Sequence, residues 1–382
     1  MDLVCDSKYC TGCGLCSIKC PKGCITMQPR DMGHLHPIID KSKCINCGIC
    51  KKICPSLNPI SKTYPSTAYA AWAKDKNEYK SSTSGGVASL LSQYIIKKGG
   101  IVYGCSIEKN LKIKHIRIDD KAELYKLKGS KYVQSSITEI LPLVQKDIEQ
   151  NKLVLFIGTP CQISAIKYLF KEHPSNLFTV DIICHGTPSN IFLEWYLLKY
   201  KHINKAKITN ITFRSTNAYK ISVFSRNQII YQTANLWSNR FEDIYTNAFF
   251  DGYSIRESCH NCLYAQPNRC SDITLGDFWG LKTNSIPDDH PYGVSLILPS
   301  SKRGEFLIQE IFNELNIYER SIEEAVDGNE QLRVPKKSTL RIKLFKALWN
   351  RLPTPFWYYI LTFDKLILFR SKKIIKQILH KH

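Results

Sequence analysis

The stretch Cys10-Thr11-Gly12-Cys13-Gly14-Leu15-Cys16-Ser17-Ile18-Lys19-Cys20-Pro21 recurs in outline as Cys44-Ile45-Asn46-Cys47-Gly48-Ile49-Cys50-Lys51-Lys52-Ile53-Cys54-Pro55. Both runs have the spacing C-x2-C-x2-C-x3-C-P. A cubane [4Fe-4S] cluster needs four thiolates around one compact core, and in two-cluster proteins the fourth cysteine of each such run binds the other cluster. We therefore predict cluster I on Cys10, Cys13, Cys16 and Cys54, and cluster II on Cys44, Cys47, Cys50 and Cys20.

Zinc and disulfides explain these runs less well. A tetrahedral zinc site needs only four ligands, so the third and fourth cysteines of each run would be redundant. Disulfides between such crowded cysteines would close strained short loops, and we expect no secretory signal. The stretch resembles a bacterial-type dicluster ferredoxin domain, and we predict an α+β unit of that kind over residues 1–58. We expect Cys5 and Cys24 to be free thiols or packing residues, and His34 and His36 to face solvent.

Composition limits the classes of function. The chain has 382 residues, 16 cysteines and a formal net charge of +20. We expect two or three domains, no membrane-spanning segment and a reducing, cytoplasmic location in an anaerobic host. Residues 333–382 hold 13 Lys or Arg residues against the single acid Asp364, a net charge of +12. Such charge suits an anionic membrane surface or an acidic partner; nucleic acid is disfavoured because no nucleic-acid motif is present.

A second unit is expected after the linker at residues 57–65. Residues 68–73 are typical of a buried strand, and residues 87–96 have the apolar period of a helix. Between them, Ser84, Gly85 and Gly86 would open that helix. A Ser- and Gly-rich helix start favours an anion, because free N–H groups point at it, although Ser84 could equally be a simple N-cap.

Two strand–turn–helix patterns follow. The apolar strands at residues 152–157 and 177–183 should be parallel neighbours buried on both faces, as in an α/β fold with a mixed or mostly parallel sheet. Cys161 and Cys184 each stand just beyond the carboxyl end of such a strand. Ligands of open α/β sheets bind at this edge, so the two cysteines together indicate a site.

A third cysteine group, Cys259-x2-Cys262-x7-Cys270, is one ligand short of a closed four-ligand site. The missing ligand must come from elsewhere in the chain. Cys161 and Cys184 are the main candidates, with Cys105 a weaker third. The group predicts a third [4Fe-4S] cluster, with structural zinc as the alternative.

Together with this cysteine group, five further sequence motifs are similar to those of a known protein family. They are Ser82-Thr83-Ser84-Gly85-Gly86-Val87, Lys128-Gly129-Ser130-Lys131-Tyr132-Val133-Gln134, Gly158-Thr159-Pro160-Cys161-Gln162, Cys184-His185-Gly186-Thr187-Pro188, and Ser271-Asp272-Ile273-Thr274-x-Gly276-Asp277-Phe278-Trp279-Gly280. In this order they resemble the beta subunit of coenzyme F420 hydrogenases and dehydrogenases. Together with the ferredoxin unit, the resemblance covers about residues 1–300.

The resemblance implies a ferredoxin-linked, flavin-dependent oxidoreductase. Such a protein would pass electrons between [4Fe-4S] clusters and FAD, and then to or from a two-electron acceptor such as coenzyme F420. It implies a third cluster on Cys259, Cys262 and Cys270 with Cys161 or Cys184, and a redox protein or ferredoxin as partner. The residues that it implies for the flavin are Ser84, Gly85, Gly86, Gly129, Ser130, Lys131 and Thr159. It implies His185 and Asp277 as flavin-adjacent or proton-handling groups, each with an alternative role in stabilising a turn.

The expected domains are 1–58 (ferredoxin), 66–148 and 149–300 (the two parts of the beta-subunit-like unit), and 301–382 (a helical basic tail). The tail departs from the family pattern. Its apolar face, from Leu340 to Leu352, and a second basic amphipathic stretch from Leu366 to Leu379 suit either a membrane surface at the inner face or packing on a protein. The alternative function is a non-catalytic electron-transfer or assembly subunit at a membrane surface, for example in polysaccharide synthesis.

Overall fold

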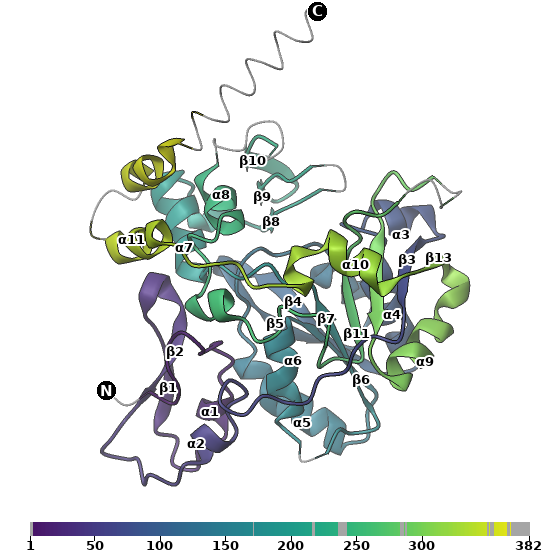
Figure 1. The fold of residues 1–382 in the computed structure, drawn as a ribbon, viewed down its shortest axis with the longest axis horizontal. Coiled ribbons are helices and arrows are strands. Elements are labelled where there is room, and N and C mark those ends of the chain that lie inside the picture. The colour runs from purple at the N-terminus through teal and green to yellow at the C-terminus, as the bar shows by residue number, and fades with distance from the viewer. Residues whose placement is uncertain are drawn as a thin grey trace, which may run out of the picture.

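The computed structural model describes residues 3–170, 172–215, 218–235, 243–282, 286, 289–349, 351, 355–364 and 367. Within them the strands form a two-stranded, a three-stranded and an eight-stranded sheet. In Figure 1 the two-stranded sheet stands at the lower left, the three-stranded sheet above it, and the eight-stranded sheet to the right.

The N-terminal unit has the predicted α+β character. The hairpin of β1 (Ile25–Pro29) and β2 (Leu35–Ile39) is antiparallel, and the short helices α1 (Leu15–Ile18) and α2 (Ile49–Lys52) belong to the two cysteine runs. Each helix starts at a glycine in the left-handed region, Gly14 with φ 77° and Gly48 with φ 72°. Only glycine adopts this conformation without strain, so the repeat in sequence becomes a repeat in local structure.

The eight-stranded sheet has the order β13-β3-β12-β11-β7-β6-β4-β5. Its strands are β3 (Ala68–Ala73), β4 (Ile101–Glu108), β5 (Lys112–Ile118), β6 (Val154–Gly158), β7 (Leu177–Ile182), β11 (Ile273–Asp277), β12 (Ser295–Pro299) and β13 (Leu315–Arg320). The neighbours β4, β6, β7 and β11 run parallel, and the outer pairs are antiparallel. The predicted mixed sheet with parallel neighbours β6 and β7 is therefore confirmed.

Helices cover both faces of this parallel core. Along β6, Val154 and Phe156 join the hydrophobic core under the helices α5 and α6, whereas Leu155 and Ile157 face the core under α4 and α9. A strand buried on both faces must be apolar throughout, which explains the unbroken apolar run. The helices beside this sheet are α3 (Lys76–Lys80), α4 (Val87–Lys97), α5 (Leu141–Glu149), α6 (Pro160–Lys167), α9 (Lys302–Glu310) and α10 (Ile322–Gly328).

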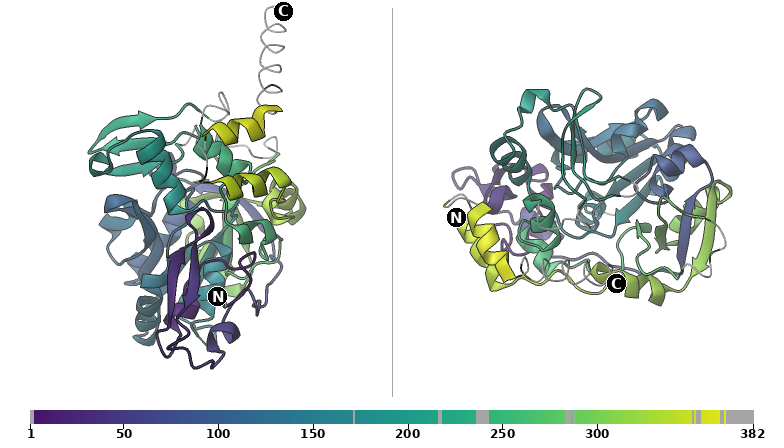
Figure 2. Two further views of the ribbon diagram at one scale, coloured as in Figure 1. Left: turned by 90° about the vertical axis from the view of Figure 1, so that its left-hand side faces the viewer. Right: turned by 90° about the horizontal axis from the view of Figure 1, so that it is seen from above.

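A second core lies beside the three-stranded sheet. Its elements are β8 (Asn210–Thr212), β9 (Ser222–Ser225), β10 (Gln228–Gln232), α7 (Asn190–Glu194) with the π-helix Trp195–Tyr200, α8 (Ile244–Phe250) and α11 (Leu340–Leu348). Figure 2 shows these elements together at one end of the molecule. Its three strands, in the order β10-β9-β8, make the described part of residues 207–240 largely β structure.

The structure corrects the C-terminal boundary. Residues 301–320 are not part of a helical tail, because β13 pairs with β3 and extends the large sheet. Of the apolar face predicted from Leu340 onward, Phe345 and Trp349 are buried in the second core, whereas Leu340 and Leu344 are exposed, so part of this face packs on the protein itself. The stretch from Leu366 to Leu379 lies outside the described residues except for Ile367. In the described part of the chain, no helix is long and apolar enough to cross a membrane.

Candidate metal centres and sheet-edge site

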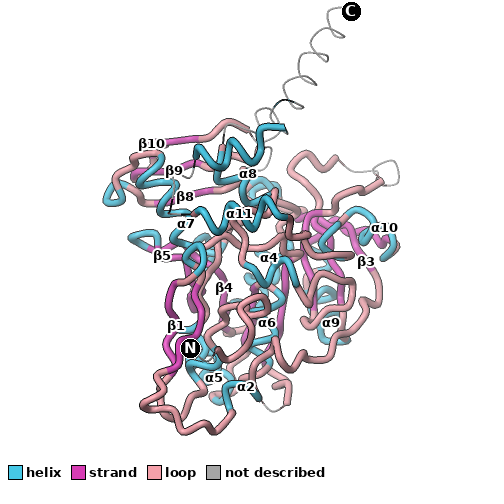
Figure 3. The backbone as a smooth tube through the Cα atoms, turned by 60° about the vertical axis from the view of Figure 1, so that its left-hand side comes forward, coloured by secondary structure: helices cyan, strands magenta, loops and turns pink. Residues whose placement is uncertain are grey.

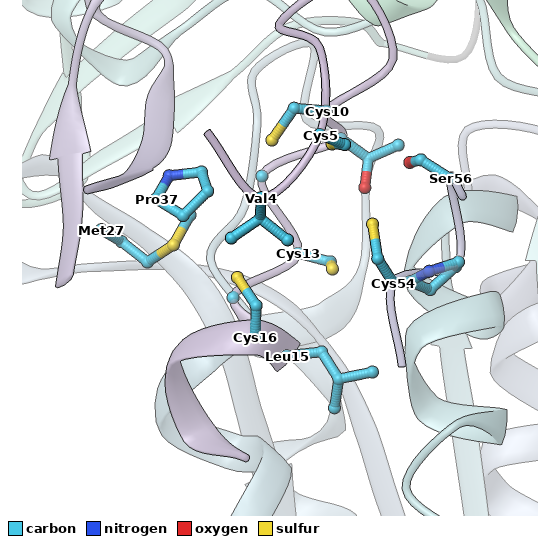
Figure 4. Close-up of a pocket in the computed structure, with 14 residues that line it drawn as sticks. Val4, Cys5, Cys10, Cys13, Leu15, Cys16, Met27, Pro37, Cys54 and Ser56 are labelled. Carbon is cyan, nitrogen blue, oxygen red and sulfur yellow. The ribbon is translucent and has the colours of Figure 1, made fainter. Parts of the chain in front are cut away.

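The four cysteines predicted for cluster I line one pocket. Its walls include Cys10, Cys13, Cys16 and Cys54. Figure 4 shows the four sulfur atoms arranged around a common space, with Cys13 just before α1, Cys16 in α1 and Cys54 from the second run. Four thiols from two runs around one space fit a group that needs four thiolate ligands.

A fifth thiol, Cys5, lies in the same pocket. It is free and buried, as expected, but it hydrogen-bonds with both Cys10 and Cys54. The interaction with Cys5 lowers the pKa of Cys10, and a hydrogen bond with His36 and the charge of Arg256 act in the same direction. The surroundings of Cys10 therefore stabilise its thiolate, the form in which cysteine binds metals.

The cysteines predicted for cluster II gather at the outer end of the unit. Cys44 and Cys47 both act electrostatically on Cys50, and Cys20 approaches Cys24 with the sulfur atoms 3.3 Å apart. Cys47 is exposed, whereas Cys10 and Cys16 of the first set are buried. The two predicted clusters thus differ in their access to solvent.

The expectation that His34 and His36 face solvent is wrong. Their exposed fractions are 4% and 3%. His34 Nδ1 lies 3.2 Å from Gln134 Oε1, and the hydroxyl of Ser189 donates to the carbonyl of Met32 in the turn beside it. The hairpin packs against the α/β unit, and this tertiary contact could not be read from the local sequence.

The third cysteine group lies at the carboxyl edge of the parallel strands. Cys259 is in the 3-10 helix Glu257–Asn261, Cys161 is in the first turn of α6, and Cys184 follows β7. Burial raises the pKa of Cys161, and the nearby thiols of Cys184, Cys262 and Cys259 raise it further. Burial also raises the pKa of Cys184 to about 12, with Cys259 and Cys262 again contributing. Both candidates for the missing ligand are therefore close to the group.

Cys270 belongs to the same neighbourhood. Its thiol lies 3.5 Å from the carbonyl oxygen of Pro160, next to Cys161. Burial raises the pKa of Cys270 to about 12. Across the described residues, no three His, Cys, Asp or Glu side chains form a group suited to a single bound metal ion.

Two buried arginines flank these cysteines. Arg256, 1% exposed, donates from Nη2 to the carbonyl of Leu35 at 2.6 Å and from Nε to the carbonyl of Cys10 at 2.5 Å, and Nη2 lies 3.6 Å from Cys10 Sγ. The same guanidinium lowers the pKa of Cys259 electrostatically, although burial is the larger effect and raises it. Arg256 therefore lies between the first and third cysteine sets.

Arg269 is held by an ion pair with Asp181 at 2.8 Å, with side chains 2% and 0% exposed. Backbone hydrogen bonds tie Arg269 to Thr63 in the linker. The linker thus runs along the third cysteine group, and the Lys62 ammonium donates to the carbonyl of Leu263 at 2.5 Å.

Tyr264 lies near cysteines of both sets. Burial is the main cause of its raised pKa, and the charges of Cys270, Cys161 and Cys13 raise it further. Cys13, Cys161 and Cys262 all pack against one core that contains Tyr264 and Cys270. The ferredoxin unit therefore presents its first cluster site, rather than its second, to the third cysteine group.

The two loops predicted to hold the flavin lie side by side. Thr83 Oγ1 is 3.5 Å from Ser130 Oγ, and Ser84 Oγ is 3.4 Å from Ser295 Oγ. Gly86 caps α4 in the left-handed region with φ 86°, without a side-chain cap. At Gly85 a Cβ atom would lie 2.1 Å from the carbonyl oxygen of Ala71, so packing alone requires this glycine. Gly129 is an exposed left-handed turn residue with φ 84°.

Lys131 and Thr159 have structural partners. The Lys131 ammonium donates to the carbonyls of Leu127 and Lys128, both at 2.8 Å, and burial lowers its pKa to about 8. Thr159 is the N-cap of α6 in a capping box with Gln162. Its hydroxyl also lies 3.1 Å from Cys161 Sγ, so this residue borders the third cysteine group.

His185 and Asp277 share the sheet edge. Asp277 ends β11 and forms an ion pair with Arg214, whose guanidinium lies over the ring of Tyr219 at 4.7 Å. Burial lowers the pKa of His185, and the charge of Asp277 opposes this. The structure brings the two residues into electrostatic range, with Asp277 already paired.

Two matches to models of one protein family cover most of the α/β unit. The models for the coenzyme F420 hydrogenase/dehydrogenase beta subunit match residues 68–142 (N-terminal part) and 151–325 (C-terminal part), which together are well over half of the chain. The chain belongs to this family. A 4Fe-4S dicluster domain matches residues 9–58. The family assignment and the fold class expected from the sequence are thus confirmed.

Among solved structures, the chain is similar to a chain of the F420-reducing [NiFe] hydrogenase complex from Methanosarcina barkeri. The identity is 17% and the TM-score 0.46, over 71% of this chain and 91% of that chain. No curated protein matches. The family supports an iron–sulfur redox role for this beta-subunit relative.

Sequence reasoning missed the arginines and tyrosines around the cysteines. Arg256 stands three residues before Cys259, and Arg269 directly precedes Cys270. Charged residues beside metal-binding cysteines are a usable signal, because second-shell groups set the electrostatics of a centre. Arg214 and Tyr264 have no such local signal, since only the fold brings them to the site.

Proposed function

We propose that this chain is a flavin-dependent iron–sulfur oxidoreductase. It would pass electrons between ferredoxin-type [4Fe-4S] clusters and FAD, and then to or from a two-electron acceptor such as coenzyme F420 or another reducible substrate. The observation that carries the proposal is the sequence of thiol sites from the exposed Cys47, through the buried pocket of Cys10 and Cys13, to the third group near Tyr264.

The four thiols of cluster I would be Cys10, Cys13, Cys16 and Cys54, and those of cluster II Cys44, Cys47, Cys50 and Cys20. Cys13 of the cluster I site and Cys161 of the third group pack against one core, and such closeness suits electron transfer between the two sites. The ferredoxin unit is anchored on the α/β unit, because Leu15 is fully buried in the core under α5 and α6, and Gly14 lies against Thr138. This anchoring supports a fixed distance between the cluster I site and the third cysteine group. A Cβ atom at Gly14 would lie 2.2 Å from Thr138 Oγ1.

A third [4Fe-4S] cluster is proposed on Cys259, Cys262 and Cys270, completed by Cys161 or Cys184. Serine substitutions tell the two candidates apart. Cys161→Ser or Cys184→Ser should lower the iron content by about four per chain in whichever variant removes a ligand. The control, Cys105→Ser, should retain all the iron. Full iron in both variants would contradict the proposed ligand set.

FAD is proposed at the edge of the sheet near α4. A flavin converts between one-electron and two-electron transfer, which a link between clusters and a hydride acceptor requires. Among described helices of eight or more residues, α4 and α5 lack a side-chain cap, whereas α6, α9 and α11 have one. The first amides of α4, reached past Ser84 and Gly86, are therefore suited to a pyrophosphate.

The remaining proposed roles follow from charge. With its pKa lowered by burial, His185 is neutral at pH 7 and able to accept a proton. Asp277 forms an ion pair with Arg214, so it would instead keep the Arg214 guanidinium in place beside the flavin. Of the loop residues, Ser130 lies within reach of Thr83, whereas the ammonium of Lys131 is engaged by backbone carbonyls.

The test is an anaerobic absorption spectrum of the purified chain with counts of iron, sulfide and flavin. We expect about twelve irons and one flavin per chain, because each cubane holds four irons. About eight irons without flavin would instead favour the non-catalytic electron-transfer subunit. Zinc in place of iron would overturn the proposal.

We also propose a peripheral membrane contact for the end of the chain. Residues 355–364 are helical, and Phe356, Ile360 and Phe363 project from one helical face with exposed fractions of 59%, 47% and 60%. Ile367 continues this spacing. Exposed aromatic and aliphatic side chains within a segment of net charge +12 suit an anionic lipid surface.

A further inference from the structure

The outer end of the ferredoxin unit carries an exposed surface beside the cluster II site. It comprises residues 41–48, the helix α2, and the neighbouring Ile18 and Lys22, hereafter the cluster II face. Figures 1 and 3 place the loop between β2 and α2 at the lower edge of the molecule, away from the large sheet. All of this segment lies in the described part of the chain.

The two cluster sites are inequivalent in their surroundings. Around the cluster I site, Arg256 and Tyr264 belong to the α/β unit and enclose the cysteines. Around the cluster II site, Cys47 is exposed, and Gly48 has no atom within 4 Å of the position of an added Cβ atom. An electron passing between an outside protein and the third cysteine group would therefore enter or leave through the cluster II site.

The cluster II face has an apolar centre and a basic rim. Ile45 is 58% exposed, and Ile18 and Ile49 are each 37% exposed. Residues 41–52 contain four lysines and no acidic residue. The same segments carry five exposed lysines: Lys22, Lys41, Lys43, Lys51 and Lys52. The nearest carboxylate in sequence, Asp40, forms an ion pair with Lys43.

We propose that the cluster II face is the docking surface for an acidic one-electron carrier protein. This inference rests on the proposed function, because it requires a redox centre behind the surface. A small apolar centre with a charged rim suits a transient complex, in which opposite charge accelerates encounter more than it strengthens binding. The lysine rim selects a carrier whose own redox centre is ringed by carboxylates.

The electron balance is simple. Each docking event oxidises the carrier by one electron and reduces this chain by one electron, or the reverse. A two-electron acceptor at the far end therefore needs two docking events. No bond is formed between the carrier and the chain, so exchange must be fast, which agrees with a small interface.

Stopped-flow reduction of the holoprotein tests the proposal. The probe is a reduced acidic two-cluster ferredoxin, and reduced methyl viologen serves as a small donor that needs no protein interface. The variant is Lys51→Gln with Lys52→Gln. Its matched control is Lys97→Gln with Lys98→Gln, an exposed lysine pair at the end of α4. Both are measured at low salt and at about 0.5 M salt, where exposed charges are screened.

We expect the Lys51 and Lys52 variant to be reduced by ferredoxin about tenfold more slowly at low salt, with the difference vanishing at high salt. The control pair and all reactions with methyl viologen should match the wild type. Equal rates for the two variants, or no reduction of wild type by ferredoxin while methyl viologen still reduces it, would overturn the docking proposal alone. Failure of methyl viologen to reduce the wild type would overturn the proposed function. Salt-dependent binding of this face to anionic vesicles, with unchanged ferredoxin rates, would assign it to lipid instead.

Discussion

Arg256 is the residue that joins the two halves of the molecule most directly. Its guanidinium crosses from the segment before Cys259 into the ferredoxin unit and ends beside Cys10. A buried positive charge near a cluster favours the reduced, more negative state. The contact also requires Gly12, because a Cβ atom there would lie 2.6 Å from Arg256 Nη1.

Arg256→Leu should lower the midpoint potential of cluster I by roughly 60 mV, which corresponds to a tenfold change in a one-electron equilibrium. The measurement is a redox titration followed by electron paramagnetic resonance. Arg256→Lys keeps the charge and should stay close to the wild-type potential. Equal shifts in the two variants would show that the side chain acts only through packing.

Lys131 provides a second prediction at this scale. Its pKa of about 8 in the folded protein lies below that of a free lysine, so folding disfavours the charged form. Between about pH 8 and pH 10 the unfolded chain binds the extra proton, and stability contributed by this residue must therefore rise with pH. The melting temperature of wild type relative to Lys131→Met should increase over this range. A difference in melting temperature that does not change with pH would show that the Lys131 ammonium is solvated rather than buried.

At the scale of elements, the exposed stripe of residues 355–367 makes a separate prediction. Phe356→Ser with Phe363→Ser should reduce co-sedimentation with anionic vesicles about tenfold, because two large apolar contacts are lost. Iron and flavin content should not change. The control is Phe306→Ser with Phe312→Ser, which alters two other exposed aromatic residues, on and after α9. An equal loss in the control, or none in either variant, would contradict a specific membrane contact.

Helices and strands could be predicted from the sequence where a local spacing or apolar period is enough to define them. The Cys-rich runs, the strands β6 and β7 and the helix α4 each have a spacing or period that depends on few neighbours. The burial of His34 and His36 was not predictable, because it arises from contacts with residues about 100 positions away, such as Gln134. The pairing of β13 with β3 joins segments more than 200 residues apart, which explains why the tail was placed too early.

In the candidate site, too, some residues could be predicted from local sequence and others depend on the fold. Cys161 and Cys184 were identified because both follow parallel strands, and parallel strands end at one edge of a sheet. The ion pair of Arg214 with Asp277 could not be predicted, because Arg214 comes from the region of the three-stranded sheet and reaches β11 only in the folded chain. Likewise, nothing local in the sequence indicated that Lys131 turns back onto carbonyls rather than toward an anion.

At the scale of the whole molecule, the three cysteine sites follow one another in a line. The exposed cluster II site is outermost, the cluster I site lies against the α/β unit, and the third cysteine group is at the carboxyl edge of the parallel strands. The linker along Arg269 and the anchor at Arg256 hold the ferredoxin unit in one orientation. Electrons from outside would therefore reach the flavin only through cluster I.

The most direct measurement is the rate of flavin reduction by reduced ferredoxin in the Cys13→Ser variant, followed anaerobically by stopped-flow absorbance. We expect flavin reduction to fall at least about a hundredfold, because the central site of the path is broken, while the flavin is still bound and still exchanges electrons with a two-electron donor such as reduced coenzyme F420. Reduction at the wild-type rate would contradict a path through cluster I.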